Sequence, residues 1–355
     1  MKAVILVGGE GTRLRPLTWR RPKAIVPILN RPFLEYLVGY LKEHGITEVI
    51  LAMGYLPDPI QECLGDGSKL GVRLHYVVED SPMGTSGAVK NAEQFLDERF
   101  LVFNGDILTG IDLSDMIRHH LEGRVSVSIA LTPVDNPTIY GVIETDEKSR
   151  VRRFVEKPGW DEVTTNMINA GIYVIEPEIL DRIPASRPSM FEHDIFPSLL
   201  DDDKPMLGYP SDAYWIDIGT PEKYLQAHHD LLLERGDEYI QTDGTSEIEP
   251  DASIRGPVMI AGSCVIAKSA RITGPAVLGE GCHIGGGTRI EGSILWDGVR
   301  AGERSQITNS VIGTRSHIGG GCYIPSGCVL GDEVHMEPGY RIPEGTKVEP
   351  AEHLG

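Results

Sequence analysis

The stretch Ile260-Ala261-Gly262-Ser263-Cys264-Val265-Ile266-Ala267-Lys268-Ser269-Ala270-Arg271-Ile272 has an isoleucine at every sixth position. A small residue, Cys264 or Ala270, precedes the next isoleucine by two positions. A period of six matches neither the 3.6-residue turn of a helix nor the alternation of a strand. It is typical of a left-handed parallel β-helix, in which each face of a triangular coil takes one hexad and the aliphatic side chain points into the core.

The six-residue period occurs in two series that differ in phase. The first series is Ile254, Ile260, Ile266, Ile272, Leu278, Ile284, Ile290 and Trp296, and the second is Ile312, Ile318, Ile324, Leu330 and Met336. The change of phase predicts an irregular coil, or a loop that leaves the β-helix, over 297–311. Four of the five cysteines (Cys264, Cys282, Cys322 and Cys328) occupy the small position, so we interpret them as core residues rather than disulfide partners or metal ligands.

The rest of the chain has a different composition. Of the 41 glycines in 355 residues, 20 lie in the last 105. Before these, strand-like runs alternate with helical patterns: strands are predicted over 3–7, 48–53, 74–78, 100–103 and 125–131, and helices over 32–44 and 220–235. This alternation predicts an α/β domain with a Rossmann-like, mainly parallel sheet and helices on both faces. We expect that domain over 1–236, a polar linker over 237–250 and the β-helix over 251–355.

The charge balance excludes several classes of partner. The chain has 33 Lys and Arg against 52 Asp and Glu, a net charge of −19, which argues against nucleic-acid binding. No apolar run approaches the roughly 20 residues that a membrane helix needs. The amino-terminal run is too short for a signal peptide, so we expect a cytoplasmic protein with no membrane partner. Residues 1–23 differ from the rest, since six basic residues and one acidic residue predict a local anion site.

A glycine-rich loop follows the first predicted strand. The strand Ala3–Val7 runs directly into Gly8-Gly9-Glu10-Gly11-Thr12-Arg13, where glycines would let backbone N–H groups approach an anion closely. The loop is not a dinucleotide motif, because Leu14 stands in place of the third glycine, and no Gly-Lys-Ser/Thr follows as in a Walker motif. Arg13, and Lys23 ten residues later, could converge on a polyphosphate.

Two aspartates lie where a doubly wound sheet binds its ligands. Asp106 follows the strand over 100–103, and Asp217 follows Tyr214-Trp215-Ile216. Carboxylates that meet a nucleoside triphosphate suggest Mg²⁺, which is usually held by one or two carboxylates and phosphate oxygens. Either aspartate alone would equally fit a turn.

A second group of polar residues suits a sugar. Glu156-Lys157 places an acid and a base before Pro158, and Asn169-Ala170-Gly171 and Tyr140-Gly141 supply polar and small groups. Lys157 by itself would equally fit an exposed edge position.

Together these motifs resemble the sugar nucleotidyltransferases, or NDP-sugar pyrophosphorylases. The matching motifs, in order from Gly9 to Pro221, are GxGTRLxPLT, PKA, GD, EKP, NAG-Y and WxDIGTP. The segments 79–88, 140–144 and 154–158 are most similar to the mannose-1-phosphate guanylyltransferases. The sequence departs from the family at 83–88, which reads MGTSGA where LGTAGA is usual.

The resemblance implies that an NTP and a hexose 1-phosphate react to give an NDP-sugar and pyrophosphate, with GTP and mannose 1-phosphate as the best match. It implies Arg13 and Lys23 as catalytic cations and Asp106 and Asp217 as Mg²⁺ ligands. The implied nucleotide site is Leu6, Gly8, Gly9, Gly11, Thr12, Arg13, Lys23, Glu79, Pro82, Gly84 and Asp106. The implied sugar-phosphate site is Gly141, Glu156, Lys157, Asn169 and Asp217.

Other functions remain open from the sequence. The enzyme could be a glucose-1-phosphate thymidylyl- or uridylyltransferase, or a non-catalytic paralogue that binds an NDP-sugar. The β-helix could be an acyltransferase with His283, His317 or His335 as its base, although a histidine on a repeat surface usually has no such role. The simplest role for the β-helix is assembly, so we expect a homo-oligomer formed through it.

Overall fold

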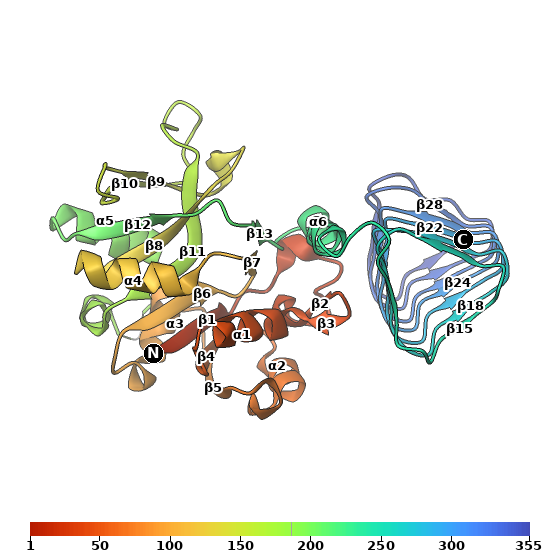
Figure 1. Cartoon of the computed structure of the whole chain (residues 1–355), viewed down its shortest axis with the longest axis horizontal. Helices are drawn as coiled ribbons and strands as arrows, with labels where there is room; N and C mark the ends of the chain where they lie inside the picture. The colour runs from red at the N-terminus through yellow and green to blue at the C-terminus, as the bar shows by residue number, and fades with distance from the viewer. Residues whose placement is uncertain (186) are drawn as a thin grey trace. The chain divides into compact units, whose positions relative to one another are not determined.

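The computed structural model describes residues 1–185 and 187–355, which form two compact units (Figure 1). The first unit comprises residues 1–9 and 34–216, and the second comprises residues 10–33 and 217–355. The first is an α/β unit and the second contains a parallel β-helix, as the sequence predicts. The division differs from the predicted boundary at residue 236, because residues 10–33 and the segment after residue 216 group with the β-helix. No helix in the described part of the chain is long and apolar enough to cross a membrane.

The sheet of the first unit is parallel in one half and mixed in the other (Figure 1). The parallel half has the order β5 (Arg73–Val78), β4 (Glu48–Met53), β1 (Lys2–Val7) and β6 (Phe100–Asn104). The other half contains β11 (Met167–Ile175), β8 (Val127–Pro133), β12 (Met206–Pro210), β9 (Gly141–Thr145) and β10 (Val151–Glu156). The prediction of a mainly parallel sheet is correct only for the first half. In the second, β9 and β10 are joined by a short turn, which allows only antiparallel pairing.

The parallel strands are uniformly apolar because both of their faces are buried. Ala3, Val4 and Ile5 of β1 are fully buried, as expected for a sheet with helices on both sides. The helices of this unit are α1 (Phe33–Glu43), α2 (Pro57–Leu64), α3 (Gly84–Asn91), α4 (Leu113–Gly123) and α5 (Phe196–Asp201). Two short strands, β7 (Ile107–Thr109) and β13 (Trp215–Asp217), lie outside the main sheet. The predicted strands and the helix over 32–44 are therefore confirmed to within a few residues.

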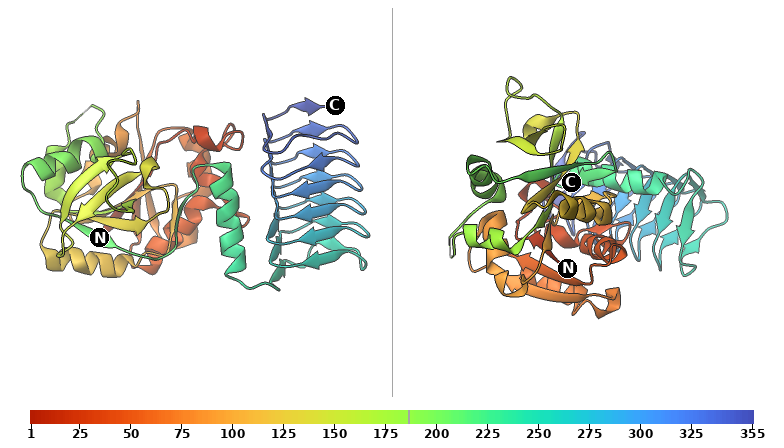
Figure 2. Two further views of the ribbon diagram at one scale, coloured as in Figure 1. Left: turned by 90° about the horizontal axis from the view of Figure 1, so that it is seen from above. Right: turned by 60° about the vertical axis from the view of Figure 1, so that its left-hand side comes forward.

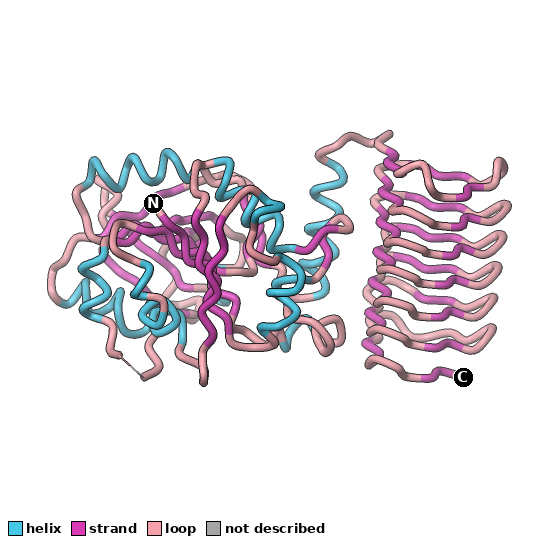
Figure 3. Tube along the Cα trace, turned by 90° about the horizontal axis from the view of Figure 1, so that it is seen from below, coloured by secondary structure: helices cyan, strands magenta, loops and turns pink. Residues whose placement is uncertain are grey.

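The β-helix of the second unit has three parallel sheets (Figure 2, Figure 3). The first sheet comprises β14 (Ile240–Thr242), β17 (Val258–Ile260), β20 (Ala276–Leu278), β23 (Ile294–Leu295), β26 (Val311–Ile312), β29 (Val329–Leu330) and β31 (Lys347–Val348). The second comprises β15 (Glu247–Ile248), β18 (Val265–Ile266), β21 (His283–Ile284), β24 (Arg300–Ala301), β27 (His317–Ile318), β30 (His335–Met336) and β32 (His353–Leu354). The third comprises β16 (Ser253–Arg255), β19 (Arg271–Thr273), β22 (Arg289–Glu291), β25 (Gln306–Thr308) and β28 (Tyr323–Ile324).

The first coil of the β-helix lies inside the segment predicted as a linker. β14 pairs with β17 and β15 pairs with β18, so residues 240–248 already belong to the coil. These two strands are exposed, because they form the open end of the stack and have a neighbour on one side only. Their composition resembles a linker for that reason.

Of the two alternatives predicted for 297–311, the irregular coil is confirmed and the loop is wrong, because the β-helix continues through this region with shortened coils. Ile272 pairs with Ile290, 18 residues later, whereas Ile290 pairs with Ile307 and Ile307 with Ile324, each 17 residues later. One residue is therefore missing from each of two successive coils. The shortened hexad after Ile290 places Leu295 in the core cluster instead of Trp296.

The interior of the β-helix matches the predicted pattern elsewhere. Cys264, Cys282, Cys322 and Cys328 are buried at the small positions, while Cys63 is exposed on α2, and all five thiols are free. The cysteines at these positions are therefore core residues, as predicted.

One outer face of the β-helix is also apolar. On the first sheet the outward residues Val277, Ile294, Val311 and Val329 are at most 2% exposed, although they alternate with core residues. The helix α6 (Pro221–Leu233) contacts β20 of this sheet. Thr220 caps α6 by accepting a hydrogen bond from Lys223 N. This face is therefore covered within the second unit.

Candidate active site

The carboxyl ends of the parallel strands in the first unit are lined by glycines. Gly8, Gly54 and Gly105 follow β1, β4 and β6, and Gly105 N donates to Leu6 O at 2.9 Å. A Cβ atom on Gly54 would lie 2.9 Å from Gly8 O, and one on Gly105 would lie 2.5 Å from Leu6 O. Only glycine fits where the strand ends pack this closely. This edge therefore offers backbone rather than side chains to a ligand, and it contains the predicted nucleotide residues Leu6, Gly8 and Gly9.

The loop after β5 brings Glu79 and Gly84 to the same edge. Glu79 Oε2 accepts a hydrogen bond from Met83 N at 3.0 Å, and burial raises the pKa of Glu79. The Glu79 carboxylate lies 3.8 Å from the position that a Cβ of Gly8 would occupy. Gly84 has φ +74° and a Cβ there would lie 2.5 Å from Ser189 O, so the loop requires glycine at this position. Pro82 is exposed within the loop.

The predicted sugar-binding residues Gly141, Glu156 and Lys157 also lie together. The carboxylate of Glu156 and the ammonium group of Lys157 are 3.6 Å apart, and Lys157 N donates to Tyr140 O at 2.9 Å. Burial raises the pKa of Glu156, although Lys157 acts in the opposite direction. A Cβ atom on Gly141 would lie 2.7 Å from Glu156 Oε2, so the missing side chain makes room for the carboxylate.

Asn169 is held in place by hydrogen bonds to Gly171 and Tyr173, which were not predicted as site residues. Its Nδ2 donates to Tyr173 Oη at 2.8 Å and its Oδ1 accepts from Gly171 N at 2.9 Å. The Tyr173 hydroxyl in turn donates to Glu192 Oε1 at 3.2 Å. Glu192 Oε2 accepts from Thr85 Oγ1 at 2.7 Å, directly after Gly84. A network of part-buried hydrogen bonds thus links the sugar-binding side to the nucleotide loop.

Glu192 carried no sequence signal, because it falls outside every motif. Tyr173 is the tyrosine of the NAG-Y motif, but nothing in the sequence marks it as the partner of Asn169. Trp215 was quoted only as part of a motif, yet its Nε1 donates to Ala170 O at 3.0 Å and its ring meets Tyr140 edge-on.

Asp106 lies in the turn between β6 and β7, at the carboxyl end of β6 as predicted. Asp217 ends β13 in the second unit, where its Oδ1 accepts a charge-assisted hydrogen bond from Lys223 Nζ at 2.6 Å. Because the two aspartates belong to different units, their shared metal site stays a prediction. Within residues 1–185 and 187–355, no three His, Cys, Asp or Glu side chains form a cluster that could hold a metal ion. Two carboxylates completed by phosphate oxygens, a common ligand set for Mg²⁺, are compatible with this arrangement.

The second unit contains Gly11, Thr12, Arg13, Lys23 and Asp217. Two glycines make room for the cations: a Cβ atom on Gly219 would lie 3.0 Å from Arg13 Nη2, and one on Gly11 would lie 3.0 Å from Lys23 Cβ. Gly11 also has φ +65°, and its carbonyl accepts from Thr18 Oγ1 at 2.8 Å. Arg13 therefore lies against the backbone two residues after Asp217.

Most of the basic side chains in residues 1–23 pair with protein carboxylates, so fewer of them can contribute to the predicted anion site than the charge of the segment suggests. Four of the six basic side chains pair with protein carboxylates: Lys2 with Asp97, Arg15 with Glu10, Arg20 with Glu333 and Arg21 with Asp332. The charge of these four groups is thus balanced within the protein. Arg13, one of the predicted phosphate ligands, packs against the backbone at Gly219.

His228 of α6 anchors the loop that carries these cations, and its burial leads to a pH prediction. His228 Nε2 donates to Pro27 O at 3.2 Å and Nδ1 accepts from Leu29 N at 3.5 Å. Burial lowers the pKa of His228 to about 3. An unfolded histidine titrates near pH 6.5, so between these values the unfolded chain binds the extra proton and stability falls as the pH falls.

Between about pH 6.5 and pH 4, we expect the free energy of unfolding of His228→Gln to fall less than that of the wild type, by up to a few kcal/mol. Urea unfolding of the wild type and the variant at pH 7 and pH 5 measures the difference. His283→Gln, at an exposed position of the β-helix, serves as the control. An equal loss of stability on acidification in the wild type and His228→Gln would contradict the assignment.

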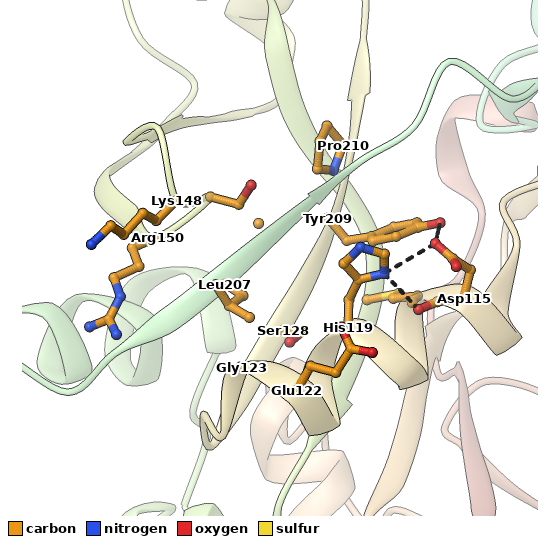
Figure 4. Close-up of a pocket in the computed structure, with 13 residues that line it drawn as sticks. Asp115, His119, Glu122, Gly123, Ser128, Lys148, Arg150, Leu207, Tyr209 and Pro210 are labelled. Atoms are coloured by element: carbon orange, nitrogen blue, oxygen red, sulfur yellow. Dashed lines mark hydrogen bonds and ion pairs between the residues drawn. The ribbon is translucent and has the colours of Figure 1, made fainter.

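A separate pocket of about 680 Å³ lies beside α4, β8 and β12 of the first unit (Figure 4). Asp115 and His119 line one side of it, and Tyr209 Oη donates to Asp115 Oδ2 at 2.8 Å. Lys148 and Arg150 line the other side. None of the predicted site residues lines this pocket.

The histidines weighed as acyltransferase bases lie on the second sheet of the β-helix. His283, His317 and His335 occupy outward positions of β21, β27 and β30. The rings of His317 and His335 are stacked with their centroids 4.9 Å apart, as the repeat of the coil dictates. Burial is the main cause that lowers the pKa of His317, with His335 adding to it.

Comparison with known proteins identifies both units. Residues 2–234 match the family described as nucleotidyl transferase, and residues 235–342 match the EIF2B subunit epsilon LbH domain, a left-handed β-helix. The mannose-1-phosphate guanylyltransferase of Mycobacterium tuberculosis is 38% identical over 310 residues, which cover 84% of this chain and 80% of that protein. The probable mannose-1-phosphate guanylyltransferase 2 of Oryza sativa is 35% identical over 345 residues, covering 95% of this chain and 92% of that protein.

A solved structure is similar to about two thirds of the chain. HddC from Yersinia pseudotuberculosis, complexed with GMP-PN, has a TM-score of 0.56 and 32% sequence identity. The match covers 64% of this chain and 97% of that chain.

Proposed function

The chain belongs to the nucleotidyl transferase family, and from this membership we propose that it converts GTP and mannose 1-phosphate into GDP-mannose and pyrophosphate. The observation that carries the proposal is the similarity to mannose-1-phosphate guanylyltransferases over both units of the chain. The first unit supports it with a glycine-lined strand edge for a nucleotide and an acid–base–amide group suited to a sugar phosphate.

The reaction needs positioning and charge neutralisation more than proton transfer. A phosphate oxygen of mannose 1-phosphate attacks the α-phosphorus of GTP in line and forms a new P–O bond. The bond from the α-phosphorus to the bridging oxygen breaks, and pyrophosphate leaves with that electron pair. No general base is required, because a phosphate monoester is largely dianionic near neutral pH.

The residues of the first unit account for substrate binding in this proposal. The backbone at Gly8 and Gly9 and the loop from Glu79 to Gly84 receive the nucleotide. Lys157 binds the sugar phosphate, while Glu156 and Asn169 bind sugar hydroxyls. The network through Tyr173 fixes the Asn169 amide, which selects the hydroxyl that it meets.

Arg13 and Lys23 carry the charge neutralisation. Three phosphate groups and the phosphate monoester repel one another, and each cation lowers that repulsion where negative charge develops. Arg13 offers a planar guanidinium that suits two phosphate oxygens, whereas Lys23 acts as a point charge.

Enzymes of this family generally use a divalent metal ion, and we propose that it is Mg²⁺ held by Asp106 and Asp217. The ion would neutralise phosphate charge. Asp217 now pairs with Lys223, whose side chain would have to share or release the carboxylate when a cation binds. The hard carboxylate oxygens of both residues are the donors that Mg²⁺ prefers.

A substrate matrix tests the proposal. GTP, ATP, UTP and dTTP are each combined with mannose 1-phosphate and glucose 1-phosphate, and pyrophosphate release is measured. We expect GTP with mannose 1-phosphate to give the highest kcat/KM. A preference for UTP or dTTP with glucose 1-phosphate would replace the proposed substrates, and no pyrophosphate release in any combination would favour the non-catalytic alternative.

Two predictions from the sequence accompany this function. We propose a homo-oligomer formed through the β-helix, which sedimentation of the full chain would test. A cytoplasmic location remains a prediction of the sequence.

A further inference from the structure

The cationic loop, residues 10–33, has little regular structure of its own. It contains two short 3-10 turns, Thr12–Leu14 and Lys23–Ile25, and a two-residue hairpin between β2 (Pro27–Ile28) and β3 (Arg31–Pro32). A segment of this length with so few internal backbone bonds needs outside contacts to hold one conformation. The β-helix and α6, which belong to the same unit, supply these outside contacts.

Arg21 contacts three residues of the β-helix. Its guanidinium donates to Thr314 Oγ1 at 3.0 Å and to Asp332 Oδ2 at 3.2 Å, and it lies 4.5 Å from the centroid of the Trp296 ring. Asp332 is 6% exposed, and its other oxygen accepts from Thr314 N at 2.8 Å. The aspartate is therefore fixed by the β-helix backbone before it meets Arg21, whose Nη2 donates to both Thr314 and Asp332 while the guanidinium lies against the Trp296 ring.

Trp296 reaches Arg21 because of the shortened hexad. Because the hexad is one residue short, Leu295 lies in the core cluster and Trp296 lies outside it. The Nε1 of Trp296 donates to Tyr224 Oη of α6 at 3.0 Å. Tyr224 donates in turn to Pro27 O of the cationic loop. The irregularity in the repeat thus provides a binding surface for the loop.

Further contacts lie on both sides of Lys23. Before it, Arg20 pairs with Glu333 and Trp19 Nε1 donates to Glu349. Arg315 and Arg20 together lower the pKa of Glu333 to about 2, so the carboxylate is charged at neutral pH. After it, Asn30 Nδ2 donates to Leu278 O at 2.9 Å.

We propose that the β-helix positions the cationic loop for catalysis, with Arg21 as a positioning residue held by Asp332, Thr314 and Trp296. This inference rests on the proposed function of Arg13 and Lys23 as phosphate ligands. It gives the β-helix a part in the reaction in addition to any role in assembly. Arg21 contacts no substrate in this proposal and acts through the loop that it fixes.

Asp332→Ala tests the proposal against a matched control. Asp297 accepts from Glu280 N at 2.9 Å in the same manner as Asp332 accepts from Thr314 N. Both alanine variants lose a bond between coils, but only Asp332→Ala loses the partner of Arg21. We expect trypsin to cleave after Arg20 about tenfold faster in Asp332→Ala than in Asp297→Ala or the wild type, because the anchored loop must open before cleavage.

The kinetic readout separates positioning from stability. We expect Asp332→Ala to lower kcat/KM for GTP about tenfold while the KM for mannose 1-phosphate changes little. Arg21→Ala should give the same loss, and the double variant should lose no more than either single variant because the two residues act as one contact. Arg21→Lys should recover only part of the activity, since an ammonium group lacks the planar guanidinium that lies over the Trp296 ring.

Asp332→Ala matching Asp297→Ala in both cleavage and kcat/KM would overturn the proposal. Faster cleavage with unchanged kcat/KM would overturn the positioning role. If the wild type released no pyrophosphate with any substrate pair, the proposed function would fail, and unequal cleavage of the two variants would still support anchoring of the loop by Asp332.

Discussion

Replacing Arg13 with alanine is expected to lower kcat/KM about a thousandfold. An arginine that stabilises a transferring phosphoryl group typically contributes about 10³ to 10⁵ in rate. Arg13 lies in the loop that follows the glycine-lined strand edge, with its guanidinium packed against Gly219. The contact with the glycine backbone restricts the side chain without neutralising it, so its charge can act on the phosphates.

Pyrophosphate release at saturating and limiting GTP measures the effect, with thermal unfolding to show that the variant is folded. Arg152→Ala is the control, because this substitution removes the same charge from the chain. Arg152 is an exposed arginine that pairs with Asp146 at 2.5 Å. Arg13→Lys should lie between the wild type and Arg13→Ala, since it keeps the charge and loses the planar donor pair. An Arg13→Ala enzyme within tenfold of the wild type would refute the assigned role.

The fold could be predicted wherever a short-range pattern records the environment of each residue. The alternation of β1 and its neighbours with helices is visible in runs such as Ala3–Val7, because both faces of those strands are buried. The β-helix is visible for the same reason, since each hexad must place one aliphatic residue in the core. Patterns of this kind depend on local spacing alone.

The errors arose where spacing alone could not locate a residue. Leu295 and Trp296 are both apolar, and only the pairing of Ile290 with Ile307 shows that one residue is missing. The exposed strand β14 was predicted as part of a linker because it forms the end of the stack and has little buried surface. In each case the neighbouring coil, rather than the local sequence, decides the structure.

The candidate site was predictable in part for a similar reason. Motifs place Glu156 beside Lys157 and Gly8 beside Gly9 because these residues are consecutive. The partners of Asn169 are different, since Glu192 reaches it only through a buried tyrosine. Likewise, the charges of Arg20 and Arg21 looked available for an anion, but Glu333 and Asp332, over 300 positions away, pair with them. Such pairs depend on the tertiary fold.

The second large effect is expected at Asp106. Asp106→Asn should lower turnover by about a thousandfold or more, which effectively abolishes it, while the fold stays intact. Asparagine has nearly the same shape as aspartate, and the backbone bond from Gly105 N to Leu6 O that fixes this turn does not involve the side chain. The variant loses one negative charge, and a divalent cation held by only one or two carboxylates depends strongly on each of them.

A magnesium titration separates the metal role from a structural one. Pyrophosphate release is followed from micromolar to tens of millimolar Mg²⁺ in the wild type, Asp106→Asn and Asp112→Asn. Asp112 caps α4 by accepting from Asp115 N at 3.0 Å, and asparagine caps a helix equally well, so this control loses the same charge at little cost. Because the carboxylate charge cannot be replaced by mass action alone, we expect Asp106→Asn to stay inactive at every concentration. Near-normal activity in excess Mg²⁺ would refute the assignment of Asp106 as an essential metal ligand.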